Sequence, residues 1–155
     1  MNKVVVEESP DRVERRSVVV GVDAQTVFDI VANPSRHQEF DGSGTVRTSR
    51  SSAPARLEAG AKFGMNMKMG VPYRMTNTVV EFVEGELLAW RHVGGHVWRY
   101  TFEPVDGGTK VTEEFDWRPA RMPPLLKLMK APTGNAEAIE KTLLRLADLV
   151  QQSPE

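Results

Sequence analysis

Four turn signals divide the middle of this sequence into pieces of about ten residues, the spacing typical of an antiparallel meander. The signals are Gly70-Val71-Pro72, Glu84-Gly85, Gly94-Gly95 and Asp106-Gly107-Gly108. Short turns of this kind join neighbouring strands directly, so the region is expected to form one continuous sheet. The sequence predicts strands at about 62–69, 73–83, 86–93, 96–103 and 109–117.

Amphipathic patterns place helices on both sides of this strand region. A β-branched run at 18–22 predicts a first strand, and Asp23 after it can accept hydrogen bonds from the free amides of a following helix. Apolar residues recur at helical spacing until Asn33-Pro34, where a second short helix begins. A strand near 45–49 and a polar loop at 51–60 follow. A long closing helix at 135–151 is predicted from one apolar face, formed by Ala136, Ile139, Leu143, Leu146 and Val150.

The composition limits the chemistry and the partners of the chain. Its 155 residues suffice for a single domain spanning 1–155, with a core at about 12–150. The absence of cysteine excludes disulfides, cysteine metal sites and thiol catalysis. A formal charge of -1 lacks the positive excess that attracts nucleic acid, so no nucleic-acid partner is expected. Since no leader-like segment or run of about 20 apolar residues stands out, we expect a cytoplasmic protein without stable membrane association.

Several short sequence motifs accompany the predicted order of a strand, two short helices, a meander and a long helix. They are Val22-Asp23-Ala24-Gln25-Thr26-Val27-Phe28, Val80-Glu81-Phe82, Leu88-Ala89-Trp90, and Trp98-Arg99-Tyr100 followed by Gly107-Gly108-Thr109-Lys110-Val111-Thr112. Over residues 12–150 the sequence resembles the START-like superfamily, specifically the polyketide cyclase/dehydrase and lipid-transport family.

This resemblance implies an α+β helix-grip fold. Its curved seven-stranded antiparallel sheet (β-αα-ββββββ-α) would wrap around a long C-terminal helix and enclose an apolar cavity. Members of the family bind lipids, hormones or polyketide-like aromatics in that cavity, and some act on them. The resemblance supplies no shared catalytic motif that could be carried over residue by residue.

Period-2 alternation indicates which side chains would line such a cavity. Methionines dominate one face of the stretch 63–69, and methionine can repack around guests of different shape, although it could simply fill a gap in a core. The same face of later strands carries Val80, Leu88, Val111 and Trp117 among others. The predicted ligand-binding residues are Phe63, Met65, Met67, Met69, Phe82, Trp90, Trp98, Tyr100, Phe102, Phe115 and Met129.

Glu113 is the first candidate catalytic residue. It alternates with Val111 and Phe115 and therefore falls on the apolar face, where burial would raise its pKa and suit a general acid or base. The alternative is a structural Glu113 that lies at the rim or pairs with an arginine such as Arg91 or Arg99. The same alternation predicts that the neighbouring carboxylates, Glu114 and Asp116, face solvent.

His92 is the second candidate catalytic residue. It shares a predicted face with Trp90 and could hydrogen-bond a ligand carbonyl or move a proton, unless the backbone satisfies its ring. His37 would border the cavity, and His96 flanks a turn. Since the three histidines lie on different elements without ligand spacing, we expect no metal and no cofactor. Serine-triad and phosphate-binding glycine patterns are also missing.

A short apolar segment at 125–129 precedes the closing helix. Its apolar residues are Leu125, Leu126, Leu128 and Met129, and Pro132 and Gly134 are expected to end it. We expect the segment to pack against the core or at the cavity mouth. A membrane-touching lid and a dimer contact are the alternatives, so the chain is expected to be a monomer or a homodimer.

These observations leave three functions open. The first is binding of a small apolar or aromatic molecule, lipid-like or polyketide-like, with Tyr100, His92 and Glu113 fixing its orientation. The second is an enzyme of the cyclase/dehydrase type, in which a carboxyl or imidazole in the cavity moves a proton. The third is a protein-interaction module that pairs through an edge strand or the segment 125–129.

Overall fold

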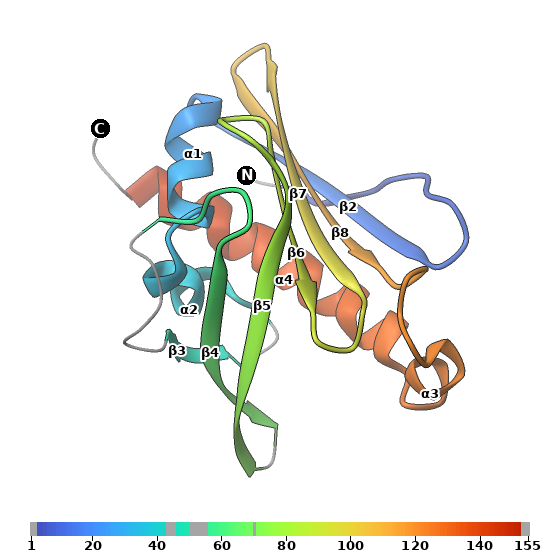
Figure 1. The fold of residues 1–155 in the computed structure, drawn as a ribbon. Coiled ribbons are helices and arrows are strands. Elements are labelled where there is room, and N and C mark those ends of the chain that lie inside the picture. Colours follow the sequence, from blue (N-terminus) through green and yellow to red (C-terminus); the bar gives the residue numbers. More distant parts are fainter. Residues whose placement is uncertain (1–2, 43–45, 50–55, 70, 153–155) are drawn as a thin grey trace.

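Figure 1 shows the computed structural model of the chain, which describes residues 3–42, 46–49, 56–69 and 71–152, with side chains at 3–42, 56–64 and 76–151. In this part of the chain, eight strands form one antiparallel sheet in the order β1-β2-β8-β7-β6-β5-β4-β3. The strands are β1 (Val5–Val6), β2 (Val13–Val20), β3 (Val46–Ser49), β4 (Lys62–Met69), β5 (Val71–Val83), β6 (Leu87–His92), β7 (Val97–Val105) and β8 (Gly108–Asp116). The helices are α1 (Ala24–Val31), the 3-10 helix η1 (Pro34–Arg36), α2 (His37–Phe40), α3 (Pro123–Leu128) and α4 (Ala131–Gln152).

The order of these elements confirms the predicted helix-grip fold. β2 to β8 are the predicted antiparallel strands, α1 and α2 follow β2, and α4 closes the chain. α4 crosses one face of the sheet (Figure 1) and packs against β2 and β8. β1 is an addition to the prediction, and its two residues pair with Ser17 and Arg16 of β2. The internal cavity stays a prediction.

The core lies between α4 and the sheet. The five apolar side chains that predicted the closing helix are all buried, and α4 turns them toward the strands. Four of them, all except Ala136, belong to the same core cluster as Val18 and Val20 of β2 and Val111 and Phe115 of β8. Burial of an aliphatic or aromatic side chain contributes about 1.5–3 kcal/mol, so this interface is the main source of stability that fixes α4 on the sheet.

Two residues were predicted to cap helix N-termini, and the structure confirms Asn33 and corrects Asp23. Asn33 accepts a hydrogen bond from the Ser35 amide at 3.1 Å and caps η1 as predicted. Asp23 lies at the start of α1, but its carboxylate accepts a hydrogen bond from the Thr26 hydroxyl and not from a helix amide. The side chain of Asp23 therefore ties the first turn together without satisfying its free amides.

A β-bulge changes the inward face of β5. The pairing of β5 with β6 shifts between Val79 and Glu81, which leaves Val80 as the extra residue. Val79 is buried and Val80 is 41% exposed, while Phe82 is partly buried against Phe28. The predicted inward position of Val80 is wrong, because a bulge shifts the alternation of a strand by one residue.

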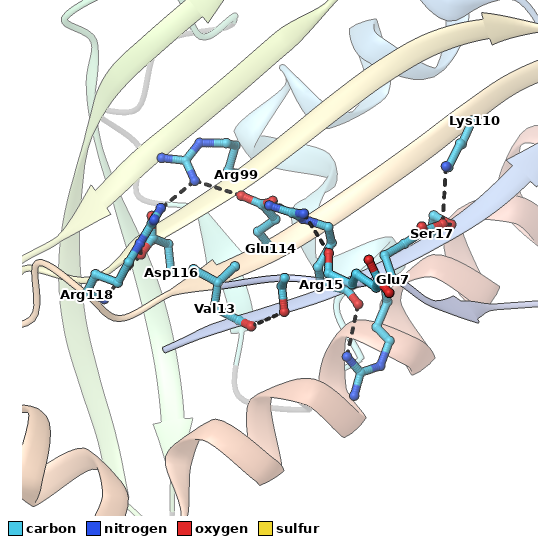
Figure 2. A network of polar contacts seen from close by, with 12 residues as sticks. Glu7, Val13, Arg15, Ser17, Arg99, Lys110, Glu114, Asp116 and Arg118 are labelled. Carbon is cyan, nitrogen blue, oxygen red and sulfur yellow. Dashed lines mark hydrogen bonds and ion pairs between the residues drawn. The ribbon is translucent and has the colours of Figure 1, made fainter. Parts of the chain in front are cut away.

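The outer face of the sheet carries a row of charged side chains (Figure 2). The guanidinium groups of Arg15 and Arg99 both donate to the carboxylate of Glu114, Arg99 at 2.7 Å. Asp116 accepts from Arg99 at 3.2 Å and from Arg118 at 2.7 Å. The prediction that Glu114 and Asp116 face solvent is wrong: they are 7% and 3% exposed, since the long arginine side chains cover them.

The segment between β8 and α4 also differs from the prediction. Lys130, with a φ of 59°, separates α3 from α4, whereas Pro132 and Gly134 lie inside α4. Proline is tolerated there because an amide in the first turn has no helical partner. Leu126 is partly buried against the core, but Leu125, Leu128 and Met129 are exposed. Core packing of the whole segment is therefore wrong, since so short a helix buries only one side.

Candidate functional site

Glu113 is a buried carboxyl group on the inner face of β8. It lies opposite Tyr100 of β7, is 4% exposed, and its Oε1 atom has no hydrogen-bond partner among the described residues. Burial raises the pKa of Glu113 well above its usual value, the hydrogen bond from Tyr100 lowers it in part, and the charge of Asp41 raises it further. These effects favour a protonated, neutral carboxyl that can both donate and accept a hydrogen bond.

Tyr100 provides the neighbouring hydroxyl. Its side chain is 3% exposed, and its ring lies 5.6 Å from that of Trp90 and 6.3 Å from that of Phe102, measured between centroids. Burial raises the pKa of Tyr100 well above 10, and the nearby Glu113 raises it further. The phenol therefore stays neutral and donates toward the Glu113 carboxyl.

Asp41 adds a third acidic group, which the sequence did not single out as a site residue. It follows α2, and its charge raises the pKa values of both Glu113 and Tyr100. The backbone around it is held on α4, where its carbonyl accepts from Arg145 at 2.5 Å and the Gly42 amide donates to the Thr142 hydroxyl at 2.8 Å. The only sequence signal was the position of an acidic residue at the end of a short helix.

Gly42 is the point at which α2 approaches α4. A Cβ atom on this glycine would lie 2.5 Å from both the Cβ atom of Lys141 and the backbone nitrogen of Thr142, and 2.7 Å from the carbonyl oxygen of Ala138. Distances this short leave no room for a side chain. The glycine therefore sets how closely Asp41 can approach the inner face of the sheet.

An aromatic cluster extends the inner face beyond Tyr100. His37 of α2 stacks on Trp90 at 5.2 Å and meets Phe63 edge-on at 5.7 Å. Its Nε2 atom donates to the carbonyl of Val31 at 2.8 Å, and burial lowers its pKa to about 4. His37 is thus a neutral imidazole whose N–H is already hydrogen-bonded, which suits a structural role in the aromatic cluster.

The other candidate catalytic residue lies elsewhere on the sheet. His92 ends β6, four residues beyond Leu88, which pairs with Tyr100 opposite Glu113, so it lies roughly 13 Å along the strands from the carboxyl. The Gly94 amide donates to His92 Nδ1 at 2.9 Å. The backbone thus satisfies one ring nitrogen of His92, as the alternative to a catalytic role predicts. The structure does not bring Glu113 and His92 together.

His92 instead forms a histidine pair with His96. The two rings stack at 4.2 Å, and His96 also meets Phe115 at 5.1 Å. Burial lowers the pKa of His96 to about 4 and also lowers that of His92. Among the described residues, no group of three His, Asp or Glu side chains could hold a metal ion.

The remaining predicted ligand-binding residues fall into three groups. Phe63, Trp90, Phe102 and Phe115 are buried in the core cluster, and Phe82 and Trp98 are partly buried against it. Met129 is exposed beside α3. The side chains of Met65, Met67 and Met69 lie outside the described residues, although their backbone forms β4 and pairs with β5.

Comparison with known proteins gives one family over most of the chain. The family model described as polyketide cyclase / dehydrase and lipid transport matches residues 12–151. Uncharacterised proteins from two strains of Mycobacterium tuberculosis are each 44% identical to the chain over 155 residues, which covers 96% of this chain and 68% of theirs.

Solved structures agree with the fold. A protein of Rhodobacter sphaeroides superimposes with a TM-score of 0.76 at 12% identity, over 98% of this chain and 100% of the other. A polyketide cyclase-like protein of Corynebacterium glutamicum gives a TM-score of 0.62 at 15% identity, over 93% and 94% of the two chains. At such low identity these structures support the architecture alone. Within the described residues, no helix is long and apolar enough to cross a membrane.

Proposed function

Because the chain belongs to the polyketide cyclase / dehydrase and lipid transport family, we propose that it binds a small, mostly apolar or aromatic molecule between the sheet and α4. Aromatic side chains of the core cluster, among them Trp90 of β6, Tyr100 of β7 and Phe115 of β8, would supply the apolar contact surface. Burial of ligand surface against them contributes roughly 25 cal/mol per Å². The ligand is therefore recognised mainly by shape and apolar area.

One observation carries this proposal: the Oε1 atom of Glu113 is buried and has no hydrogen-bond partner among the described residues. Native interiors rarely leave a buried polar atom unpaired, because the missing hydrogen bond costs about 1–3 kcal/mol. A ligand hydroxyl or carbonyl at this position removes that cost. The raised pKa of Glu113 favours the protonated carboxyl, which can donate to a carbonyl oxygen or accept from a hydroxyl, and Tyr100 beside it limits how the group is oriented.

Uptake of a fluorescent apolar probe tests the binding site. N-phenyl-1-naphthylamine has no oxygen, and 1-naphthol has a similar ring with one hydroxyl, so their competition separates apolar contact from the polar anchor. Glu113→Leu is expected to weaken 1-naphthol binding about tenfold, because one lost hydrogen bond is worth about 1.4 kcal/mol. Binding of N-phenyl-1-naphthylamine should be retained in this variant.

The conservative variant and a surface control complete this test. Glu113→Gln keeps an uncharged donor and acceptor and should bind 1-naphthol within a few-fold of the parent, and Glu103→Leu, an exposed site on β7, should change neither probe. Native mass spectrometry of the purified protein reports any co-purifying apolar molecule. The proposal is abandoned if neither probe binds and the protein carries no such molecule.

A second function, the cyclase/dehydrase type of enzyme, is favoured by the grouping of Asp41, Tyr100 and Glu113. A neutral Glu113 can protonate a ligand carbonyl oxygen, and the charge of Asp41 makes the carboxyl retain its proton until the reaction needs it. Ring closure of a poly-β-ketone probe, followed by its new aromatic absorbance, measures this activity. An enzyme loses turnover in Glu113→Gln while it still binds the probe, whereas a carrier shows no turnover in either form.

A further inference from the structure

α3 and its flanks form an exposed apolar surface outside the site described above. Met122 is 61% exposed, Leu125 43%, Leu128 79% and Met129 63%, and we call these four residues the α3 surface. Leu125, Leu128 and Met129 are three and four residues apart, so they share one side of the helix, while Leu126 turns toward the core. So dense a group of large exposed apolar side chains marks a contact surface.

Cations accompany the residues of this apolar surface in the sequence. The sequence from 118 to 134 contains Arg118, Arg121, Lys127 and Lys130 and has no aspartate or glutamate, whereas the whole chain has a charge of -1. Arg118 pairs with Asp116 at 2.7 Å, but no ion pair joins the other three cations to any described carboxylate. Arg121, Lys127 and Lys130 are all exposed. Their charge is therefore available to an anionic partner.

The position of α3 is fixed by the fold. The Arg121 amide donates to the Gly94 carbonyl of the β6–β7 turn at 2.9 Å, and Ala120 beside it is buried. At its other end, Lys130 in the left-handed region sets the angle between α3 and α4. Figure 1 shows α3 at one end of the molecule, beyond the start of α4. The apolar side chains are thus held outward on a defined support.

We propose that the α3 surface docks reversibly on the surface of an anionic lipid bilayer. The four apolar side chains enter the boundary between headgroups and acyl chains, and the Lys127 and Lys130 ammonium groups contact lipid phosphates or carboxylates. A second copy of the chain fits less well, because a two-fold contact would bring the unpaired cations of both copies together. The docking is independent of any ligand between the sheet and α4.

Co-sedimentation of the full chain with vesicles tests the proposal without an added ligand. Vesicles of phosphatidylcholine with about 30% phosphatidylserine should bind the protein, and pure phosphatidylcholine vesicles should bind it at least about tenfold more weakly, because each basic residue near an anionic surface adds to the affinity. Binding should fall as salt is raised from 50 to 500 mM. Lys127→Glu with Lys130→Glu, and separately Leu128→Ser with Met129→Ser, should each reduce binding about tenfold or more.

Matched variants elsewhere on the surface control for net charge and hydrophobicity. Lys3→Glu with Lys62→Glu makes the same charge change, and Val19→Ser with Val83→Ser removes two exposed apolar side chains away from α3. Both should bind vesicles like the parent chain. The proposal fails if the parent chain does not bind anionic vesicles, or if the control pairs lose as much binding as the α3-surface variants. It also fails if sedimentation shows a dimer that Leu128→Ser dissociates. Probe binding between sheet and α4 is measured separately, so either proposal can fail alone.

Discussion

Glu113 and Glu114 are adjacent in β8 and similarly buried, but their side chains lie on opposite faces of the sheet and have different partners. Glu113 points into an apolar interior where its Oε1 has no described partner, and Glu114 lies on the outer face between two guanidinium groups. Two carboxyls that are 4% and 7% exposed therefore have quite different surroundings. Burial alone therefore does not distinguish the candidate site residue Glu113 from Glu114; the two differ in whether neighbouring groups complete the hydrogen bonds of the carboxyl.

The outer face shows how a complete set of partners is built. Arg99 bridges Glu114 on β8 and Glu81 on β5, reaching Glu81 at 2.6 Å across β6. The residue of β6 that lies between them is Ala89, whose small side chain leaves the path open and is itself buried. Although burial opposes it, hydrogen bonding to Arg118 and Arg99 lowers the pKa of Asp116 below its usual value. Arg99 and the carboxylates of Glu81, Glu114 and Asp116 therefore compensate one another's charges.

Replacing each glutamate by leucine gives the largest expected contrast. Glu114→Leu leaves Arg15 and Arg99 without their shared carboxylate and is expected to lower the free energy of unfolding by about 3 kcal/mol, the lower end for a buried pair because Arg15 remains partly exposed. Near pH 4, where the carboxyl is mostly protonated in both the folded and the unfolded chain, Glu113→Leu removes a group that is already incompletely paired and should change stability by less than about 1 kcal/mol. Urea denaturation of both variants measures the contrast, and equal losses would contradict it.

The pH dependence of stability should separate the inner face from the outer. The folded-state pKa of Glu113 lies above its unfolded value, so its stabilising effect is complete below the unfolded pKa and is lost as pH rises toward the folded one. Between these limits the parent should lose up to about 1.4 kcal/mol per pH unit relative to Glu113→Gln. Unfolding of both proteins from pH 4 to 8 tests this.

Asp116 and Glu81 should have the opposite sign. Their folded-state pKa values are lowered, so their stabilising effect is present above the unfolded values and is lost as the pH falls through the folded ones. Asp116→Asn should therefore flatten the acid side of the stability profile and leave the alkaline side unchanged. A variant of Asp116 that altered the profile only above pH 6 would show that the two faces are not electrically distinct.

A conservative change, Arg99→Lys, tests the outer-face network itself. A lysine keeps the charge but loses the planar fork that contacts Glu81, Glu114 and Asp116 together, so a loss of about 1–2 kcal/mol is expected. Arg91→Lys, an exposed position on β6, is the matched control and should be neutral. Thermal unfolding at low and high salt would show whether the fork or the bare charge is responsible. An unchanged Tm for Arg99→Lys would show that only the positive charge at this position matters, and not the planar guanidinium group.

The same comparison explains what the sequence could predict. Turn spacing and apolar periodicity are local signals, and they predicted the strand and helix order and the inward position of Glu113 correctly. The burial of Glu114 depends on Arg15, which is 99 residues away in the chain, and on Arg99 from a third strand. Alternation cannot show that a charged side chain is covered by other charged side chains. The bulge at Val80 likewise arises from pairing between strands.

The candidate site was predictable only in part for the same reason. Glu113 and Tyr100 fall on one face by alternation within their own strands, but Asp41 reaches them from a short helix that the chain places against α4. The exposure of Leu128 and Met129 was not predicted, because an apolar run of this length fits a core or a surface equally well.

Gly42 has a consequence for how mutations in this chain are interpreted. Any side chain at this position would push the end of α2 away from α4 and carry Asp41 out of its electrostatic contact with Glu113. In a saturation scan scored by ligand uptake, position 42 should be as intolerant as position 113, although glycine has no group that can touch a ligand. A residue can thus register as functional solely through the space it leaves unfilled.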